Sequence, residues 1–418
     1  MAKQATIIGG GIVGLSAAFY LHQNGWQVRV IDKGDLLNNC SYGNAGYICP
    51  SHFIPLATPG NVKAGIKWMW NPESPFYVQP RLHMSLIQWG LQFMRSASAA
   101  HIERSAVPLR DIALLSMQCY EEMRQTPGFD FYYEHKGLLE LFQSEEKAHH
   151  AEELVEKARQ LNLDAVLLSR EEVQALEPQT EVNALGAVLF KCDAHCKPND
   201  LMQNLLNYLH SKGVELITME EVVGFAMHNK EVVKIQTKQN QYDTDLVVLA
   251  AGSWSRELAA KLHISIPLMP GRGYSVMSAD PQHRLNYPAV LMEGRVALTP
   301  MNGATRFGGT MEVTTTKTPP RLNRVRGILN AVKKYYPAFD IPLPPMDKIW
   351  YGYRPCSADG LPYLGRSRQF QNLILATGHS MIGLSLGAGT GKLVAEIANN
   401  TPLSMDIKAF EPERFARV

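Results

Sequence analysis

The chain has few cysteines, little net charge and no long hydrophobic run. Only six of its 418 residues are cysteine, and they are scattered, so reduced thiols in a cytoplasmic protein are expected. Basic residues exceed acidic ones by two, which gives no basis for a nucleic-acid partner. No apolar segment approaches the roughly 20 residues of a membrane-spanning helix. These absences predict a soluble globular protein.

The N-terminal segment does not fit a secretory signal. Lys3 precedes an apolar stretch, but Gly9, Gly10 and Gly11 would break its apolar helix, and no A-x-A cleavage site follows. The chain is long enough to form two domains with large cores.

A glycine motif near the N-terminus predicts a dinucleotide site. A short apolar strand leads to Gly9, Gly11 and Gly14, an apolar helical stretch follows, and a second strand ends at Asp32. In this motif the first glycine allows a tight turn, the second lets the backbone approach a pyrophosphate, and the third lets helix and strand pack closely. The helix N-terminus favours the phosphates, and the acid accepts hydrogen bonds from a ribose.

Similar patterns return twice. Apolar strands ending in small-residue turns occur at 245–254 and 372–379, and different segments separate them. This order predicts an α/β fold, in which discontinuous segments form a Rossmann-like nucleotide-binding domain and the insertions form an α+β substrate domain with a mixed or antiparallel sheet. The predicted nucleotide-binding segments are 1–80, 190–265 and 350–418, and the predicted substrate-binding segments are 81–189 and 266–349.

One cluster of cysteine and histidine residues could bind a metal, but we do not predict a metal site there. Cys192, His195 and Cys196 lie within five residues, but no second cluster completes a zinc set. The end of a strand followed by the start of a helix explains the segment better, so no metal is expected.

Several further motifs resemble a known family. Ser41-Tyr42-Gly43-Asn44-Ala45-Gly46, Gly352-Tyr353-Arg354-Pro355 followed by Asp359-Gly360, and Thr377-Gly378-His379 are similar to segments of the FAD-dependent amino-acid oxidases and dehydrogenases. The likeness extends over essentially the whole chain and is greatest to the bacterial D-amino-acid dehydrogenase branch. It implies hydride transfer from the α-carbon of a D-amino acid to flavin N5, and a quinone-type electron acceptor. Cys356 does not match the offset of the family's covalent attachment site, so noncovalent FAD is expected.

The resemblance also implies positions for the cofactor. The glycine motif and Asp32 would hold the ADP half, the segment after Ser41 would run along the flavin, and the turn at His379 would face the pyrimidine edge of the ring. The predicted cofactor-binding residues are Gly9, Gly11, Ile12, Val13, Gly14, Asp32, Lys33, Ser41, Asn44, Ala45, Gly46, Val223, Ala251, Gly252, Trp254, Gly378, His379, Met381 and Gly383.

Arg354 is the predicted substrate anchor. A carboxylate is best held by a planar, permanently charged, bidentate donor, which guanidinium supplies and lysine does not. The alternative is a structural arginine paired with Asp359. Tyr274 is the second predicted catalytic residue, with core packing as its alternative. Because strand residues alternate between faces, an inward Arg354 would place Tyr351 and Tyr353 on the other face.

The substrate side chain and the electron acceptor stay open. Met381 and Leu384 depart from the dehydrogenase pattern, so a cyclic amino acid such as a proline derivative is an alternative substrate. An oxygen-using oxidase of glycine, sarcosine or proline-type amines is the alternative enzyme, and a flavin-binding electron carrier is a third hypothesis, against which Arg354 argues. The basic and aromatic run Lys63, Lys67, Trp68, Met69 and Trp70 either docks on the inner face of the cytoplasmic membrane or belongs to an ordinary packed helix.

Overall fold

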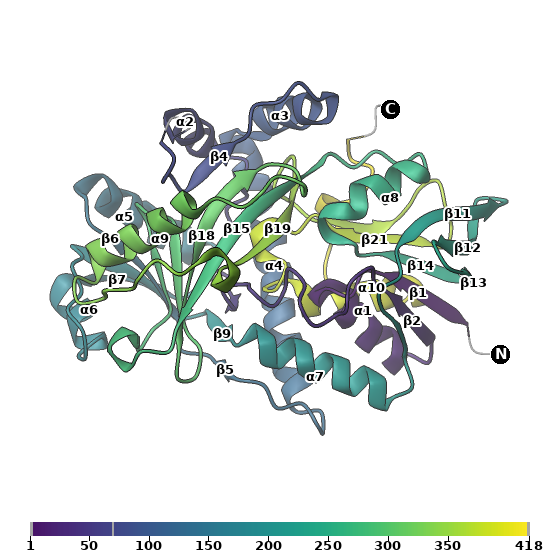
Figure 1. The fold of residues 1–418 in the computed structure, drawn as a ribbon, viewed down its shortest axis with the longest axis horizontal. Coiled ribbons are helices and arrows are strands. Elements are labelled where there is room, and N and C mark those ends of the chain that lie inside the picture. The colour runs from purple at the N-terminus through teal and green to yellow at the C-terminus, as the bar shows by residue number, and fades with distance from the viewer. Residues whose placement is uncertain (1–2, 69–70, 416–418) are drawn as a thin grey trace.

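The computed structural model describes residues 3–68 and 71–415. Two large β-sheets lie side by side, and helices pack against both (Figure 1). The fold is the predicted α/β arrangement of a Rossmann-like half and a half built on a mixed sheet. Within the described residues, no helix combines the length and apolarity that crossing a bilayer requires.

The smaller sheet has six strands in the order β10–β2–β1–β14–β21–β20. Its neighbours are parallel except for β20, which is antiparallel to β21. The central strands are almost wholly buried and apolar, as parallel strands covered on both faces are. The strands are β1 (Gln4–Ile8), β2 (Gln27–Ile31), β10 (Glu215–Ile217), β14 (Leu246–Leu249), β20 (Tyr363–Arg366) and β21 (Leu373–Thr377).

Two helices from opposite ends of the chain pack together against this sheet. They are α1 (Ile12–Gln23) and α10 (Gly387–Asn399). A Cβ atom on Gly391 would lie 2.5 Å from the backbone of Ser16, so glycine permits the close approach of the two helices. A three-stranded meander of β11 (Val222–His228), β12 (Glu231–Thr237) and β13 (Gln241–Asp243) adjoins this half.

The larger sheet has nine strands. Eight follow the order β19–β15–β18–β17–β16–β6–β8–β7, and β4 pairs with β18. The helix α9 (Leu322–Tyr335) packs against β15–β18 and shares their apolar core. The strands are β4 (Phe76–Val78), β6 (Leu138–Phe142), β7 (Ala165–Ser169), β8 (Gly186–Phe190), β15 (Leu268–Ser278), β16 (Ala289–Leu291), β17 (Val296–Pro300), β18 (Thr305–Val313) and β19 (Trp350–Ser357).

A further small sheet and seven further α-helices complete the described fold. The sheet consists of β3 (Tyr47–Ile48), β9 (Ala194–Cys196) and β5 (Tyr133–Glu134). In the segment around His195, the expected strand end is that of β8 at Phe190 and the expected helix begins at Pro198, but the short strand β9 between them was not predicted. The helices are α2 (Pro59–Trp68), α3 (Met84–Ser96), α4 (Ala99–Arg124), α5 (Glu145–Gln160), α6 (Arg170–Leu176), α7 (Pro198–Ser211) and α8 (Ser255–Lys261).

The pairings differ from the predicted division into segments in three places. The strand β19 lies in the predicted nucleotide-binding segment 350–418, but it pairs with β15 of the larger sheet. The strand β4 lies in the predicted nucleotide-binding segment 1–80, but it pairs with β18. Conversely, α4 lies in the predicted substrate segment 81–189, yet its Leu109 and Ile112 share a core with α1 and α10. Contacts between residues far apart in sequence determine which half each of these three elements belongs to, and such contacts leave no local signal in the sequence.

Candidate active site

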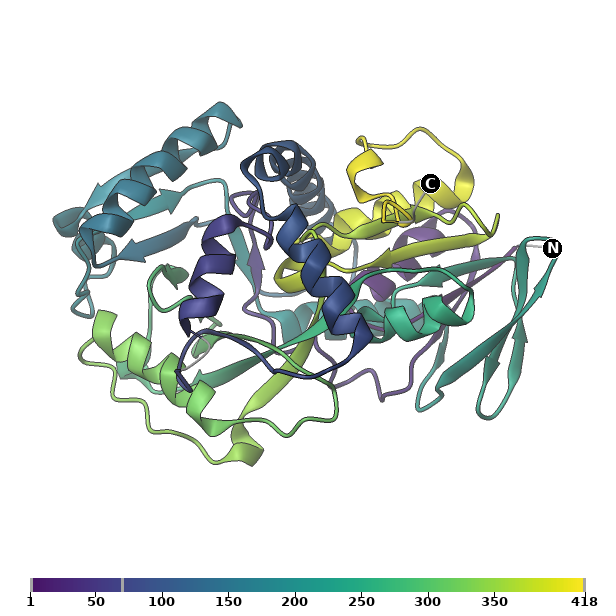
Figure 2. The same ribbon diagram turned by 90° about the horizontal axis from the view of Figure 1, so that it is seen from above.

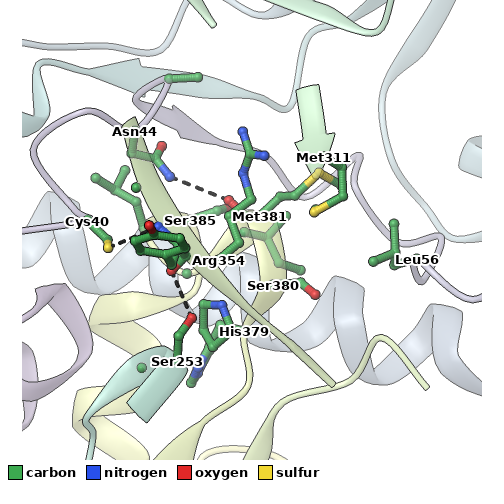
Figure 3. A pocket seen from close by; sticks show the side chains of 18 of the residues that line it. Cys40, Asn44, Leu56, Ser253, Met311, Arg354, His379, Ser380, Met381 and Ser385 are labelled. Atoms are coloured by element: carbon green, nitrogen blue, oxygen red, sulfur yellow. Dashed lines mark hydrogen bonds between the residues drawn. The ribbon is translucent and has the colours of Figure 1, made fainter. Parts of the chain in front are cut away.

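A cavity of about 1980 Å³ lies between the two sheets. It begins at the carboxyl ends of β1 and β2, where ligands of open α/β sheets bind, and extends to the inner residues of β18 and β19. Figure 3 shows part of its wall, where Cys40, Asn44, Met381 and Arg354 come from segments far apart in the chain. The volume exceeds the 300–1,000 Å³ of typical ligand pockets, so a dinucleotide and a small substrate can occupy it together.

The glycine motif forms a cradle at one end of the cavity. Gly9 has a φ of +108°, and a Cβ atom there would lie 2.5 Å from the carbonyl oxygen of Ala250. A Cβ atom on Gly14 would lie 1.9 Å from the carbonyl oxygen of Gly9. The first turn of α1 contains no acidic residue, and Gly11 supplies no side-chain cap. The Ile12 amide donates to the Ser41 hydroxyl at 3.0 Å. Because Gly11, Ile12 and Val13 line the cavity, the other amides of this N-terminus provide an anion-binding site there.

Asp32 both shapes this cradle and lines the cavity. Its Oδ2 accepts a hydrogen bond from the Gly10 amide and its Oδ1 accepts one from the Gly34 amide, each at 2.7 Å. A carboxylate has about four acceptor positions, so capacity remains for ribose hydroxyls. Asp32 therefore holds the Gly10 and Gly34 amides in addition to its predicted role of binding a ribose.

Lys33 and Trp254 meet beside Asp32. The ammonium of Lys33 lies 3.5 Å from the centre of the Trp254 ring, a cation–π contact. Burial lowers the pKa of Lys33, while Glu221 and Asp32 oppose this shift. Trp254 follows β14 and Lys33 follows β2, so the pair joins the ends of two strands at the cavity wall.

The loop predicted to run along the flavin is held by a hydrogen bond to Met381, by one within the loop, and by hydrogen bonds from β18. The side-chain amide of Asn44 donates to the carbonyl of Met381 at 3.4 Å, and its Oδ1 accepts from the Gly46 amide at 2.9 Å. Arg306 of β18 donates to the carbonyls of Tyr42 and Asn44. Burial lowers the pKa of Arg306 to about 10. The larger sheet therefore shapes a loop of the nucleotide-binding half.

His379 is a buried turn residue. Its Nε2 lies 3.0 Å from the Thr390 hydroxyl, and burial lowers the pKa of the imidazole to about 3. The ring is neutral at physiological pH, so it fits a role in shaping the turn better than one in moving protons.

Arg354 lines the cavity and has no carboxylate partner in the described parts of the chain. Asp359, the predicted alternative partner, instead binds Arg414, whose Nε and Nη2 lie 2.7 and 2.8 Å from its two oxygens. The guanidinium of Arg354 donates from Nη1 to the carbonyl of Thr310. Burial lowers the pKa of Arg354, and a desolvated cation without a counter-ion favours binding of an anion.

Comparison with known proteins identifies the family. A model described as "FAD dependent oxidoreductase" matches residues 4–397. The chain belongs to this family of FAD-dependent oxidoreductases. Its cofactor is therefore FAD.

Similar proteins include dehydrogenases and oxidases. The chain is 31% identical to a protein of Helicobacter pylori named D-amino acid dehydrogenase, over 96% of each chain. It is 26% identical to a Bradyrhizobium diazoefficiens protein named D-amino-acid oxidase, over 99% of each. Glycine oxidase from Geobacillus kaustophilus has the same fold, with a TM-score of 0.77 and 23% identity over 99% of each chain.

The cavity fits FAD in this oxidoreductase. The glycine cradle has no space for Cβ atoms, α1 presents its N-terminus, and Asp32 retains free acceptor positions beside them. Most residues predicted to bind the cofactor line the cavity: Gly9, Gly11, Ile12, Val13, Asp32, Lys33, Ser41, Asn44, Ala45, Val223, Ala251, Gly252, Trp254, His379, Met381 and Gly383.

Three predicted cofactor residues are outside this lining set. Gly14 packs α1 against the glycine turn, as its place in the motif predicts. Gly46 has a φ of +85°, and a Cβ atom there would lie 2.2 Å from the Cys196 carbonyl oxygen. Gly378 has a φ of +80° and is packed against Tyr363. These glycines allow the backbone turns behind the cavity wall.

The side chain of Tyr274 is buried, and its hydroxyl is hydrogen-bonded within the protein. It is 1% exposed, and its hydroxyl donates to Glu312 at 3.0 Å and accepts from the Arg321 amide at 2.9 Å. Its strand register pairs it with Tyr351, and Gly273 with Gly352, so its side chain is on the face opposite to Arg354. This placement favours core packing, the alternative to catalysis. Tyr353 shares this face and donates its hydroxyl to the Thr316 carbonyl. Alternation separates these tyrosines from Arg354 on the strands, yet Tyr274, Tyr351 and Tyr353 also line the cavity.

Several lining residues were not identified from the sequence. Cys40 accepts a hydrogen bond from the Tyr353 amide at 3.2 Å, and Trp350 covers Gly43 and Gly352. Thr310 and Glu140 come from the larger sheet. Only pairing between distant segments brings them to the cavity, so no local motif indicates them.

Among the described residues, one cluster of side chains has the composition of a metal site. Ligand atoms of Cys49, His52 and Asp193 lie within 4.8 Å of one another. Asp193 already accepts hydrogen bonds from both the amide and the hydroxyl of Ser51. Hydrogen bonding therefore accounts for the burial of its carboxyl group without a metal.

Proposed function

We propose that this protein is a dehydrogenase of D-amino acids. The observation that carries the proposal is Arg354, a half-buried guanidinium in the FAD-sized cavity without a carboxylate partner among the described residues. An α-amino acid offers the matching carboxylate. The D configuration is supported by the names of the relatives that align along almost the whole chain.

The protein's residues would chiefly orient the substrate. Arg354 would hold the carboxylate, which fixes the α-carbon relative to the cofactor and lowers the entropic cost of reaction. When bound, FAD supplies an acceptor for the hydride from the α-carbon. The substrate ammonium first loses a proton to solvent. Loss of the α-hydride from the neutral amine then leaves a protonated imino acid, which reacts with water to give an oxo acid and ammonium. No dedicated protein base is required when the amine reacts in its neutral form.

The two electrons would pass from reduced FAD to a quinone-type acceptor. The name dehydrogenase, which these relatives carry, supports an acceptor other than oxygen, and the quinone class is our own proposal. The competing function is an amine oxidase that uses oxygen, and the relative named D-amino-acid oxidase favours it. The binding of a substrate carboxylate by Arg354 is common to both.

Anaerobic mixing with D- and L-amino acids tests the proposal. Bleaching of the yellow flavin by D-amino acids, including D-proline, and much slower bleaching by the L-forms is expected. Bleaching by none would contradict oxidation of amino acids and favour an electron carrier. Reduced protein is then mixed with air or with a water-soluble quinone. Rapid reoxidation by air, with a slow reaction toward the quinone, would establish the oxidase instead.

We further propose that the face carrying α3 contacts a lipid surface. Leu82, Met84, Ile87, Leu91 and Met94, here called the α3 strip, are between 46% and 102% exposed. From Met84 onward they recur at helical spacing. Residues 59–98 contain four lysines and arginines but one acid, Glu73; Lys63, Lys67 and Arg95 are exposed, whereas Arg81 is half-buried and donates to the Thr314 carbonyl. An apolar strip beside basic residues fits an anionic bilayer.

The basic and aromatic run at residues 63–70, which the sequence suggests as a membrane contact, lies next to this strip, and its residues have different environments. Lys63 and Lys67 are exposed on α2, and α2 and α3 face the viewer in Figure 2. The ring of Trp68 instead lies 5.5 Å from the Arg295 guanidinium. Met69 and Trp70 are outside the described residues. The α3 strip therefore replaces the tryptophans as the apolar part of the proposed surface.

A further inference from the structure

The strand beside Arg354 contains an irregularity at the point where the guanidinium rests. The strands β15 and β18 pair Arg272 with Glu312 and Tyr274 with Gly309. Two residues of β18, Thr310 and Met311, therefore lie opposite the single residue Gly273. This is a β-bulge, a feature that often re-aims groups beside active sites.

Thr310 has an unusual backbone conformation at this bulge. Its φ is +66°, although β-branched residues rarely adopt the left-handed region. Thr310 is buried, and its carbonyl oxygen accepts the hydrogen bond from Nη1 of Arg354. Unfavourable backbone conformations persist where surrounding structure enforces them, and they cluster at functional sites.

Gly273 provides the surface on which the guanidinium rests. A Cβ atom on this residue would lie 2.2 Å from Nη2 and 2.3 Å from both Cζ and Nη1 of Arg354. Any larger residue would require the guanidinium to move. Gly273 also faces Gly352 in the register with β19, so the arginine lies over a glycine-lined part of the sheet.

We infer that Gly273 and the Thr310 carbonyl are positioning residues that set the orientation of Arg354 for a substrate carboxylate. Nη1 is occupied by the carbonyl, whereas Nε and Nη2 donate to no residue within 3–68 and 71–415. These N–H groups provide the two adjacent donors of a bidentate pair. The inference rests on the proposed function and adds the backbone geometry that makes one arginine orientation available.

The substitution Gly273→Ala tests this geometry. The probe is whichever D-amino acid bleaches the wild-type flavin at the lowest concentration. We expect the half-saturating concentration to rise about 10- to 100-fold, the range of losing one or two charge-assisted hydrogen bonds. Retained flavin absorbance and an unfolding temperature near that of the wild type establish that the variant is folded.

A double-mutant cycle separates positioning from general damage. In an Arg354→Ala background the added methyl group has space, so Gly273→Ala should change half-saturation less than about twofold. An equal loss in both backgrounds would overturn the inference, as would an unaffected single variant. If Gly273→Ala fails to fold, Arg354→Lys decides, because lysine cannot donate to the Thr310 carbonyl and also present two adjacent donors to a carboxylate. Half-saturation at least about 10-fold above the wild-type value supports the inference, and half-saturation within about twofold of wild type would overturn it. Failure of every amino acid to reduce the wild type would instead reject the proposed function.

Discussion

Asp359 binds Arg414 through two hydrogen bonds, at 2.7 and 2.8 Å, and so does not neutralise Arg354. The two acid–base partners are 55 residues apart in sequence, whereas Asp359 and Arg354 are five apart. Asp359 therefore pairs with Arg414 of the C-terminal segment and not with Arg354, its neighbour in sequence. As a result, the Arg354 guanidinium is available at the cavity wall for a substrate carboxylate.

Replacement of Arg354 should weaken substrate binding without removing FAD. For Arg354→Ala we expect half-saturation of anaerobic flavin reduction to rise about 100-fold, because two charge-assisted hydrogen bonds contribute about 3 kcal/mol together. Arg354→Lys should recover only part of this loss, since lysine keeps the charge but not the planar pair of donors. Rapid-mixing absorbance measures both variants. Loss of flavin from Arg354→Ala would show that the arginine is structural.

Asp359→Asn is the matched control for that experiment. It weakens the ion pair with Arg414, so the unfolding temperature should fall. Half-saturation should stay near the wild-type value because Arg354 does not use this carboxylate. A loss of substrate affinity equal to that of Arg354→Ala would contradict the separate roles of the two arginines.

The glycine cradle should tolerate no added methyl group. For Gly14→Ala we expect protein with little bound flavin, because the Cβ atom would lie 1.9 Å from the Gly9 carbonyl oxygen and displace α1 from the turn. Gly90→Ala in α3 has no atom within 4 Å and should raise stability by up to about 1 kcal/mol, the helix-propensity difference. Flavin absorbance per protein and urea unfolding measure these effects. Full flavin content in Gly14→Ala would contradict the packing argument.

The sequence predicted the parts of the site that local chemistry determines. The glycine turn and Asp32 belong to a short motif whose spacing carries a physical requirement, whereas Arg354 was predicted from the family resemblance and from guanidinium chemistry; Gly9, Gly11, Asp32 and Arg354 all line the cavity. Thr310 could not be predicted, because its left-handed conformation results from a bulge between strands distant in sequence. The membership of β19 in the larger sheet depends on pairing with β15 and has no local signature either.

Protonation of His379 should contribute to acid instability. Burial lowers its pKa from 6.5 to about 3, so the folded state favours the neutral ring while the unfolded chain binds a proton below pH 6.5. The contribution is thus present above pH 6.5 and is lost progressively as the pH falls toward 3. Between pH 7 and 5 the loss is about 2 kcal/mol, at 1.36 kcal/mol per pH unit below 6.5.

The variant His379→Gln isolates this contribution. Urea unfolding at pH 7 and 5 should show a smaller decrease in stability than in the wild type, by about the amount given above. The exposed His149, whose side chain is 76% accessible, serves as control, and His149→Gln should leave the decrease unchanged. Identical pH dependence of wild type and His379→Gln would contradict a buried neutral imidazole.

Vesicle binding tests the α3 strip. Protein is mixed with vesicles of phosphatidylglycerol and phosphatidylcholine, or of phosphatidylcholine alone, and the bound fraction is measured by flotation. Binding should require the anionic lipid and weaken at high salt, because lysine and arginine near an anionic surface contribute about 1 kcal/mol each and salt screens them.

The double variant Ile87→Ser/Leu91→Ser should reduce this binding at least about 10-fold, because burial of two partly exposed aliphatic side chains contributes roughly 1 kcal/mol each. Leu167→Ser/Leu185→Ser is the control, since these leucines are 43% and 45% exposed, close to the 46% and 47% of the test pair, but lie outside the α3 strip. Equal effects of the two double variants would remove the α3 strip from the binding surface. If Ile87→Ser/Leu91→Ser instead converts a dimer to a monomer in sedimentation and leaves vesicle binding intact, the α3 strip is a contact between copies of the chain.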